Sequence, residues 1–203
     1  MGHFLSVIII NNFMDTSTTT RVNPEFIHFN VPHHRAETSY SCGAAAVRCL
    51  AEYYGFGPKG EAAWRKILNT NHDGTTPKNI VCSLRSFGLK VLVRKNLQIE
   101  ELISSLDGGW PVICPIQAWG NYRTYRNINS GHYVVVIGYD NRNLYFEDST
   151  LRRSRGWMTQ IKFFNRWHDT DMYGNYFNQS GLIIKCPWEP VKDYKLFVIQ
   201  EIE

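Results

Sequence analysis

The spacing of apolar residues divides this chain into a helical first half and a strand-rich second half. Up to about residue 107, apolar side chains recur every three or four positions, which is the period of a helix with one buried face. This period predicts helices over residues 42–54, 61–68, 78–87 and 98–106, with a short strand around Val91 and Val93. After Gly108-Gly109, continuous or alternating apolar runs predict strands over residues 111–117, 132–139, 143–147, 181–186 and 194–200, and one helix over residues 158–167. Helices followed by antiparallel strands predict an α+β fold, with N-terminal helices packed on a C-terminal antiparallel sheet.

Residues 1–30 are predicted to form an N-terminal arm, and residues 31–203 a single domain. A chain of 203 residues can bury one sizeable core. Within the arm, apolar residues 4–10 predict an edge strand, polar residues 15–20 a turn, and the alternation over residues 26–31 a second strand. Because no apolar run is long enough to span a bilayer, we expect a soluble protein. The odd number of cysteines favours a reducing compartment, so the cytoplasm is the expected location, with export as an effector left open.

Composition and charge argue against several functional classes. The net charge of +4 is too small to indicate nucleic-acid binding. The five cysteines include no CxxC pair, so neither a disulfide framework nor a zinc site is expected, and we predict no cofactor and no metal. The adjacent residues His33 and His34 cannot easily face one metal ion and are predicted to lie on the surface. The cysteines within apolar segments are predicted to be core residues; they are Cys49, Cys82, Cys114 and Cys186.

The candidate chemistry begins at Cys42, which opens the first predicted helix. The N-terminal end of a helix stabilises a thiolate, so this position favours a nucleophile. His132 begins a predicted strand, and Asp148 follows the end of the next strand. A cysteine, a histidine and an acid in this order, each at the end of a regular element, are typical of a thiol hydrolase. A buried core cysteine and a structural histidine are the alternative interpretations.

Two other acids, Glu147 and Asp140, lie close to Asp148 in the sequence. Side chains alternate along a strand, so Glu147 is expected to point to the face opposite Asp148. Asp140 belongs to the turn between two predicted strands. Asp148 is therefore the preferred partner of His132.

Six sequence blocks carry a resemblance to a known family. They are Tyr40-Ser41-Cys42-Gly43-Ala44-Ala45, Gly74-Thr75-Thr76-Pro77, Trp110-Pro111-Val112-Ile113, Gly131-His132-Tyr133-Val134-Val135, Phe146-Glu147-Asp148 and Arg166-Trp167-His168-Asp169. In this order the chain resembles the papain-like cysteine peptidases of family 39, which trim double-glycine leaders from bacteriocin precursors, and the last block resembles their stand-alone branch. The resemblance covers roughly residues 30–186 and implies a papain-like fold. It also implies that Cys42 is the nucleophile, His132 the general base, and Asp148 the residue that orients the imidazole.

Ala36, six residues before Cys42, departs from the family pattern. The family usually has a glutamine there, whose amide helps the backbone N–H of the cysteine to form the oxyanion hole. Alanine lacks this donor, and removing one such donor typically lowers the rate by about 10²–10³, so we expect weakened activity. Gln117 is the preferred substitute donor and Thr38 a weaker one, whereas the carboxylate of Glu37 would repel an oxyanion.

Four explanations for Ala36 stay open. The alanine is an engineered substitution, or the enzyme takes its donor from elsewhere, or the chain is a degenerate binder, or the glutamine lies at another register.

The predicted function is cleavage of a peptide bond through a thioester intermediate. The resemblance implies a peptide or protein substrate, and narrow subsites that accept small residues such as glycine. Gly131 and the loop that contains Trp119 are predicted to contact this substrate. A catalytically weak peptide-binding module is one alternative, and a transamidase, deamidase or acyltransferase with the same triad is another. The sequence does not predict an oligomeric state.

Overall fold

The structure is a computed structural model that describes residues 29–118, 120, 123, 126, 128, 130–152, 155–191, 194 and 199–202. The strand predicted over residues 4–10 and the turn over residues 15–20 lie outside this part of the chain, as does Trp119. Within it, no helix combines the length and the apolar character needed to cross a membrane.

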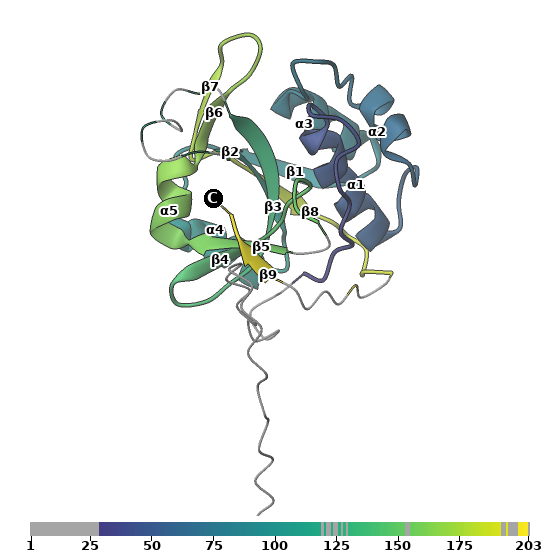
Figure 1. The fold of residues 1–203 in the computed structure, drawn as a ribbon. Helices are drawn as coiled ribbons and strands as arrows, with labels where there is room; N and C mark the ends of the chain where they lie inside the picture. The colour runs from purple at the N-terminus through teal and green to yellow at the C-terminus, as the bar shows by residue number, and fades with distance from the viewer. Residues whose placement is uncertain are drawn as a thin grey trace, which may run out of the picture.

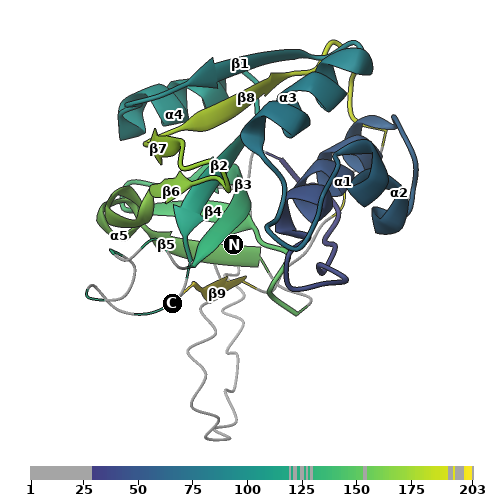
Figure 2. The same ribbon diagram turned by 90° about the horizontal axis from the view of Figure 1, so that it is seen from above.

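Five helices flank a central sheet in the described part of the chain (Figures 1 and 2). On one side lie α1 (Cys42–Tyr54), α2 (Glu61–Ile67) and α3 (Pro77–Ser86), and on the other lie α4 (Ile99–Asp107) and α5 (Gln160–Arg166). α1 ends at Gly55, whose φ of 73° is a left-handed conformation that favours glycine. α3 begins after Thr76, whose hydroxyl accepts a hydrogen bond from the backbone N–H of Asn79 at 3.2 Å. The first four helices confirm the predicted ranges to within one residue.

Among the described residues, the central sheet contains seven strands in the order β1-β8-β2-β3-β4-β5-β9. These strands are β1 (Lys90–Arg94), β2 (Val112–Gln117), β3 (Gly131–Tyr139), β4 (Asn143–Glu147), β5 (Arg155–Thr159), β8 (Gly181–Lys185) and β9 (Ile199–Glu201). Neighbouring strands are antiparallel, except for the parallel pair β5–β9. The middle strands β2 and β3 are almost entirely buried, so the hydrophobic core lies around them. The predicted α+β fold is confirmed.

The region after β4 differs from its sequence prediction. Residues 155–159 form β5, in which Met158 pairs with Leu144, so the helix predicted over residues 158–167 begins too early. The hydroxyl of Thr159 accepts a hydrogen bond from the backbone N–H of Lys162 at 3.2 Å, and this cap starts α5 at Gln160. An unpredicted hairpin follows, formed by β6 (His168–Thr170) and β7 (Tyr176–Asn178).

The described part of the strand predicted over residues 26–31 is not a strand. Residues 29–31 have no regular structure, although the backbone N–H of Phe29 donates to the carbonyl of Ile137 at 3.0 Å. β3 already pairs with β2 on one side and with β4 on the other, so no third strand can add to it. The single bond falls at an irregularity in the β3–β4 pairing between Val136 and Gly138.

The cysteines divide between core and surface. Cys49 and Cys114 are fully buried, as predicted. Cys82 is exposed and Cys186 is only half-buried, so the prediction of a core position is wrong for Cys82 and only partly right for Cys186. Cys82 lies on the outer face of α3, between residues whose side chains form the buried face of that helix.

The prediction that His33 and His34 lie on the surface is wrong. Both are half-buried, and each bonds a different acid: His33 contacts Glu147 at 2.6 Å, and His34 contacts Glu52 at 2.7 Å. Because their partners differ, the two rings do not converge. In the described residues no group of three or more histidine, cysteine, aspartate and glutamate side chains could hold a metal ion.

Glu147 is the centre of a buried polar cluster on the face of β4 that carries its side chain. Its carboxylate contacts Nδ1 of His33, and Nη1 of Arg155 donates to its other oxygen at 3.5 Å. Nη2 of Arg155 donates to the carbonyls of Val31 and Tyr194, both at 2.9 Å. The cluster therefore connects the segment before α1 to β4, β5 and the C-terminal segment.

Replacement of Glu147 by alanine is expected to lower the free energy of unfolding by about 3–5 kcal/mol, because it leaves the buried Arg155 guanidinium without this counter-charge. The matched control is Glu201→Ala, which removes the exposed ion pair with Lys162 at 3.1 Å and should cost less than about 1 kcal/mol. Urea unfolding of the two variants measures the difference. Equal losses would show that the cluster does not hold the fold together.

Candidate active site

Cys42 is the first residue of α1 and lies where the helical layer meets β3. The next residue, Gly43, allows this close approach, because a Cβ atom there would lie 2.9 Å from Cβ of Thr75 and 3.2 Å from Cδ2 of Tyr133. Tyr133 also donates its hydroxyl to the carbonyl of Thr75 at 3.0 Å, which fixes the loop before α3 against β3. Cys42 is half-buried, so its thiol lies at the surface of a cleft and not in the core.

His132 and Asp148 meet at the ends of two paired strands. His132 is the second residue of β3, and its Nε2 bonds Oδ1 of Asp148 at 2.8 Å, with both side chains about 1% exposed. Oδ1 of Asp148 also accepts hydrogen bonds from the backbone N–H of Thr150 at 2.8 Å and from its hydroxyl at 2.7 Å. Asp148 is thus held in place independently of the histidine.

The electrostatics favour a protonated His132. Burial lowers the pKa of its imidazole, but the charge and hydrogen bond of Asp148, together with a hydrogen bond and charge from Cys42, outweigh burial and raise this pKa to about 10. Burial likewise raises the pKa of Asp148, yet the His132 charge and the bonds from His132 and Thr150 bring it below its ordinary value. Since Nε2 bonds the aspartate, Nδ1 is the ring nitrogen left for the thiol. The structure therefore brings Cys42, His132 and Asp148 together.

The two competing acids are placed as the strand pattern predicts. Glu147 bonds His33 and Arg155, which lie away from His132. Asp140 accepts hydrogen bonds from the backbone of Asn143 at 2.7 Å and from the hydroxyl of Tyr145 at 2.5 Å, so it closes the turn between β3 and β4. Neither acid is available to His132.

The geometry does not support Gln117 as a substitute oxyanion donor. Its side chain is fully buried, and its amide nitrogen donates to Asp169 at 2.8 Å and to the carbonyl of His168 at 3.4 Å. Its amide oxygen accepts from the backbone N–H of Ser130 at 3.0 Å. Both amide hydrogens are therefore engaged, and Gln117 instead joins the end of β2 to β6.

Residues 36–38 line the cleft, but their backbone donors are occupied. The backbone N–H of Ala36 donates to the carbonyl of Ser149 at 2.9 Å, that of Glu37 to Glu61 at 3.1 Å, and that of Thr38 to the hydroxyl of Ser41 at 3.1 Å. The Glu37 carboxylate bonds Arg65 at 3.3 Å. By contrast, the hydroxyl of Thr38 is buried and has no hydrogen-bond partner among the described residues.

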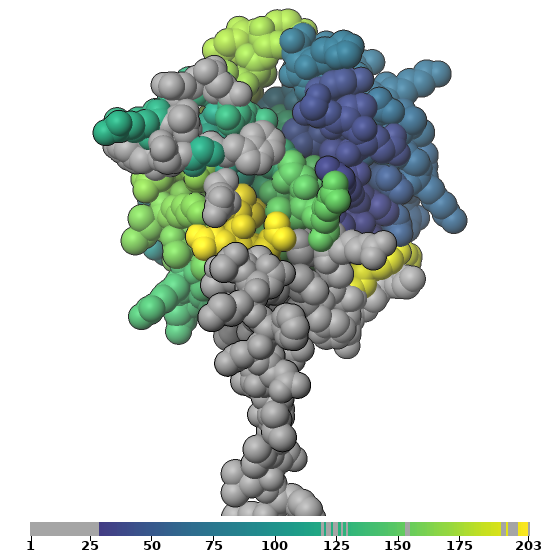
Figure 3. All heavy atoms as spheres, in the orientation of Figure 1, coloured from purple at the N-terminus to yellow at the C-terminus, as the bar shows by residue number. Residues whose placement is uncertain are grey.

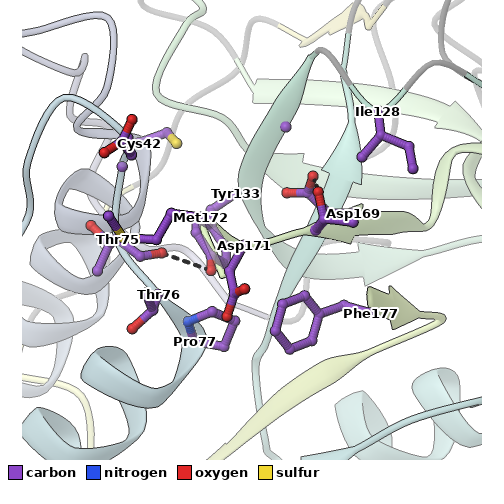
Figure 4. Close-up of a pocket in the computed structure, with 14 residues that line it drawn as sticks. Cys42, Thr75, Thr76, Pro77, Ile128, Tyr133, Asp169, Asp171, Met172 and Phe177 are labelled. Carbon is purple, nitrogen blue, oxygen red and sulfur yellow. Dashed lines mark hydrogen bonds between the residues drawn. The ribbon is translucent and has the colours of Figure 1, made fainter. Parts of the chain in front are cut away.

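Two cavities meet at Cys42. One, of about 650 Å³, is lined by residues 35–39, Cys42, residues 131–132 and residues 149–150. The other, of about 220 Å³, lies between residues 73–77 and the β6–β7 hairpin, and also includes Gly131 and Tyr133 (Figure 4). In Figure 3 the atoms of the hairpin stand beside those of the helical layer. Gly131 lies on the wall of each cavity, so the two cavities adjoin at this residue and at Cys42.

Sequence reasoning missed two contributors to this site. Thr150 bonds Asp148 but follows it in an irregular turn. Asp169 enters the smaller cavity from β6, next to Gly131. The only sequence signal for Asp169 is that it belongs to the block Arg166-Trp167-His168-Asp169, which carries part of the family resemblance. In the structure Asp169 packs against Gly131 of β3, the strand that carries His132.

The pKa of His132 is expected to fall in an Asp148→Asn variant, because the strongest stabiliser of the imidazolium is lost while burial remains. A raised histidine pKa stabilises the folded protein fully below pH 6.5, and this contribution is lost as the pH rises toward about 10. Unfolding free energy should therefore decline more steeply over this range in the parent chain than in the variant. Histidine ring NMR, assigned with His132→Ala, measures the pKa directly, and an unchanged value in Asp148→Asn would contradict this account.

Comparisons with known proteins agree with this fold. The peptidase domain of Streptococcus ComA, a bifunctional ABC transporter of a quorum-sensing pathway, is 22% identical with a TM-score of 0.56, over 75% of this chain and 96% of that domain. A protein from Bacillus anthracis described as a C39-like peptidase is 17% identical with a TM-score of 0.58, over 81% of this chain and 98% of that one. A double-glycine-motif protease of an AMS/PCAT transporter, solved with its leader peptide, is 18% identical with a TM-score of 0.55, over 83% and 96% of the two chains.

No curated protein matches the chain. A model of the Peptidase_C39-like family, however, matches residues 27–175, which is most of its length. This chain therefore belongs to the Peptidase_C39-like family.

Proposed function

We propose that this protein is a thiol hydrolase that cleaves a peptide bond with Cys42 as nucleophile. The observation that carries the proposal is the convergence of Cys42, His132 and Asp148 where the two cavities meet. Membership of a peptidase family supports the same chemistry. The proposed substrate class, a peptide or protein, is supported by this chemistry and by the two cavities on either side of Cys42.

The proposed reaction proceeds through a thioester. His132 holds the thiol proton, and the sulfur of Cys42 forms a bond to the substrate carbonyl carbon. His132 then donates the proton to the amide nitrogen, the C–N bond breaks, and the amine leaves. Water next gives a proton to His132 and attacks the thioester carbonyl, which releases a carboxylic acid and restores the thiol. Asp148 does not change its protonation state; it keeps Nδ1 of the ring directed at Cys42.

We further infer that Thr38 supplies the second oxyanion donor. The first is the backbone N–H of Cys42, which at the first position of a helix has no intrahelical acceptor. The neighbouring backbone donors at residues 36–38 are occupied, whereas the Thr38 hydroxyl is buried without a partner among the described residues. An unmet buried hydroxyl is costly, and rotation about its χ1 angle could direct this one at an oxyanion in the cavity.

A second candidate function is that of a peptide-binding module with little turnover. Ala36 favours it, because the side-chain amide expected at this position is absent and the cleft nevertheless remains open. This candidate and the hydrolase predict similar binding and differ in the reactivity of Cys42. The acyl-transfer alternatives share the thioester and differ from hydrolysis only in the acceptor, so product analysis by mass spectrometry distinguishes them.

Alkylation by iodoacetamide near pH 7 is expected to modify Cys42 quickly, and His132→Ala should slow this reaction roughly tenfold or more, because the histidine stabilises the thiolate. Cys82 is the internal control: it is exposed on α3, and its rate should not change in the variant. Mass spectrometry of digests follows both residues. If Cys42 reacts no faster than Cys82 and is insensitive to His132→Ala, the pair is not assembled and the binding module becomes the better account.

Loss of the Thr38 hydroxyl in Thr38→Val is expected to lower kcat by about 10²-fold, with Thr38→Ser retaining most of the rate, because only the serine variant keeps a donor. Ala36→Gln should raise the rate of the parent chain and restore that of Thr38→Val. Ala36→Met, of similar size but without a donor, is the control and should do neither. An unchanged kcat in Thr38→Val would exclude Thr38 as the donor without affecting the role of Cys42.

A further inference from the structure

The smaller cavity beside Cys42 combines an acidic wall with apolar ones. It lies between the loop before α3 and the β6–β7 hairpin, and Figure 4 shows Asp169 and Asp171 on the hairpin side, across from Cys42. Met172 and Phe177 contribute apolar surface. The described residues that line this cavity include three aspartates, with Asp73 as the third, and no lysine, arginine or histidine.

Of the three aspartates that line this cavity, Asp169 is the one that packs against Gly131, the residue before His132. It occupies the space that a side chain at residue 131 would fill, since a Cβ atom on Gly131 would lie 2.7 Å from both of its oxygens. Oδ1 accepts hydrogen bonds from Gln117 and from the backbone N–H of Thr170, each at 2.8 Å. Oδ2 accepts no hydrogen bond from the described residues and remains available to a ligand. Glycine at residue 131, next to His132, is what admits this carboxylate to the cleft.

The other two aspartates are less suited to contact a substrate. The carboxylate of Asp171 stabilises the hairpin turn, because it accepts hydrogen bonds from the backbone N–H groups of Tyr173 and Asn175, both at 3.0 Å. Asp73 is exposed at the edge of the loop. Both add negative potential to the cavity without a fixed oxygen directed at a ligand.

Burial disfavours the negative charge of Asp169, and a bound cation would offset this desolvation cost. Burial raises the pKa of this carboxyl to about 6, and Asp171 adds to the rise, while the bonds from Thr170 and Gln117 and the charge of His132 oppose it. The carboxylate is therefore mostly ionised at neutral pH. The other titratable groups that face it or lie beside it are Cys42 of α1, Tyr133 of β3, Asp73 of the loop before α3, and His168 of β6.

We propose that Asp169 is a specificity-determining residue that selects peptides with a lysine or arginine side chain close to the scissile bond. The inference rests on the proposed function, whose site shares this cavity. Met172 and Phe177 would pack against the aliphatic stem of such a side chain, and Oδ2 would accept a hydrogen bond from its charged end. A cavity of about 220 Å³ is larger than a glycine requires, so the expectation of subsites restricted to glycine does not fit this side of the cleft.

The test uses acetylated octapeptides of alanine and glycine in which one lysine is moved through every position. Matched peptides carry norleucine, which has the same stem without the charge. Cleavage by the parent chain is followed by mass spectrometry, and binding to Cys42→Ala by fluorescence anisotropy of labelled peptides. Both are repeated with Asp169→Asn, which keeps an acceptor for Gln117 and Thr170, and with Asp73→Asn as the control.

At one position, the lysine peptide should have roughly tenfold higher kcat/KM and affinity than the norleucine peptide, because it gains one charge-assisted hydrogen bond. Asp169→Asn should remove this preference and Asp73→Asn should retain it. The preference should also weaken as the pH falls below about 6, where Asp169 gains a proton. The pH comparison uses Cys42→Ala with aspartate at residue 169, so it does not depend on the folding of Asp169→Asn.

Each outcome decides between the two proposals. If lysine and norleucine peptides have equal kcat/KM and affinity, or if the lysine preference is unchanged in Asp169→Asn, the role of Asp169 is overturned. Turnover without any lysine preference leaves the hydrolase proposal intact, whereas lysine-dependent binding without turnover supports Asp169 and removes the hydrolase. If neither turnover nor lysine-dependent binding occurs, both are overturned.

Discussion

The alternation of side chains at the end of β4 is the constraint on which the candidate site depends. Glu147 and Asp148 are adjacent, so the pleat of the strand sends them to opposite faces. On one face, Glu147 bonds His33 and Arg155; on the opposite face, Asp148 bonds His132. Because the strand is anchored on one face, the carboxylate on the other face has a fixed position from which to orient the imidazole.

This anchoring also determines the shape of the cleft. His33 is three residues from Ala36, whose backbone N–H bonds the carbonyl of Ser149 immediately after Asp148. The segment that leads to α1 is therefore tied to β4 through the side chain of His33, and to the residues just after β4 through the backbone of Ala36. As a result, the wall that carries Thr38 and the strand end that carries Asp148 are positioned by the same contacts, although more than a hundred residues separate them in sequence.

Two carboxylates of the site lie in environments that give them different tasks. Asp148 is about 1% exposed and its pKa lies below the ordinary value, because His132 and Thr150 stabilise its charge. Asp169 is partly open to a cavity, and its pKa rises to about 6 because burial is less fully compensated. The first suits permanent ion pairing, whereas the second has capacity left for a positive charge brought by a ligand.

The sequence could predict the elements and residues whose signals are local. The start of α1 at Cys42, the position of His132 on β3 and the opposite directions of Glu147 and Asp148 all follow from periods and strand ends. The β6–β7 hairpin could not be predicted, because its strands of three residues have no apolar period. For the same reason Asp169 was not assigned to the site: its contact with Gly131 joins positions 38 residues apart across an element that the pattern does not reveal. The sequence favours Gln117 as the substitute donor because it does not reveal that the amide of Gln117 bonds residues of that same hairpin.

The position of Ala36 explains how a substitution at the proposed oxyanion hole would leave the rest of the site unaffected. Residues 36–38 are held by backbone bonds to Ser149, Glu61 and Ser41, none of which involves the side chain of residue 36. The path of the chain beside Cys42 is thus independent of whether that residue is alanine or glutamine. A missing donor raises only the energy of the oxyanion, which exists in the transition state and not in the bound substrate, so it lowers kcat and leaves affinity largely intact. If both proposals hold, substrate selection and turnover are separable in this fold: the cavity on the Asp169 side would govern the first, and the Thr38 side of the cleft would govern the second.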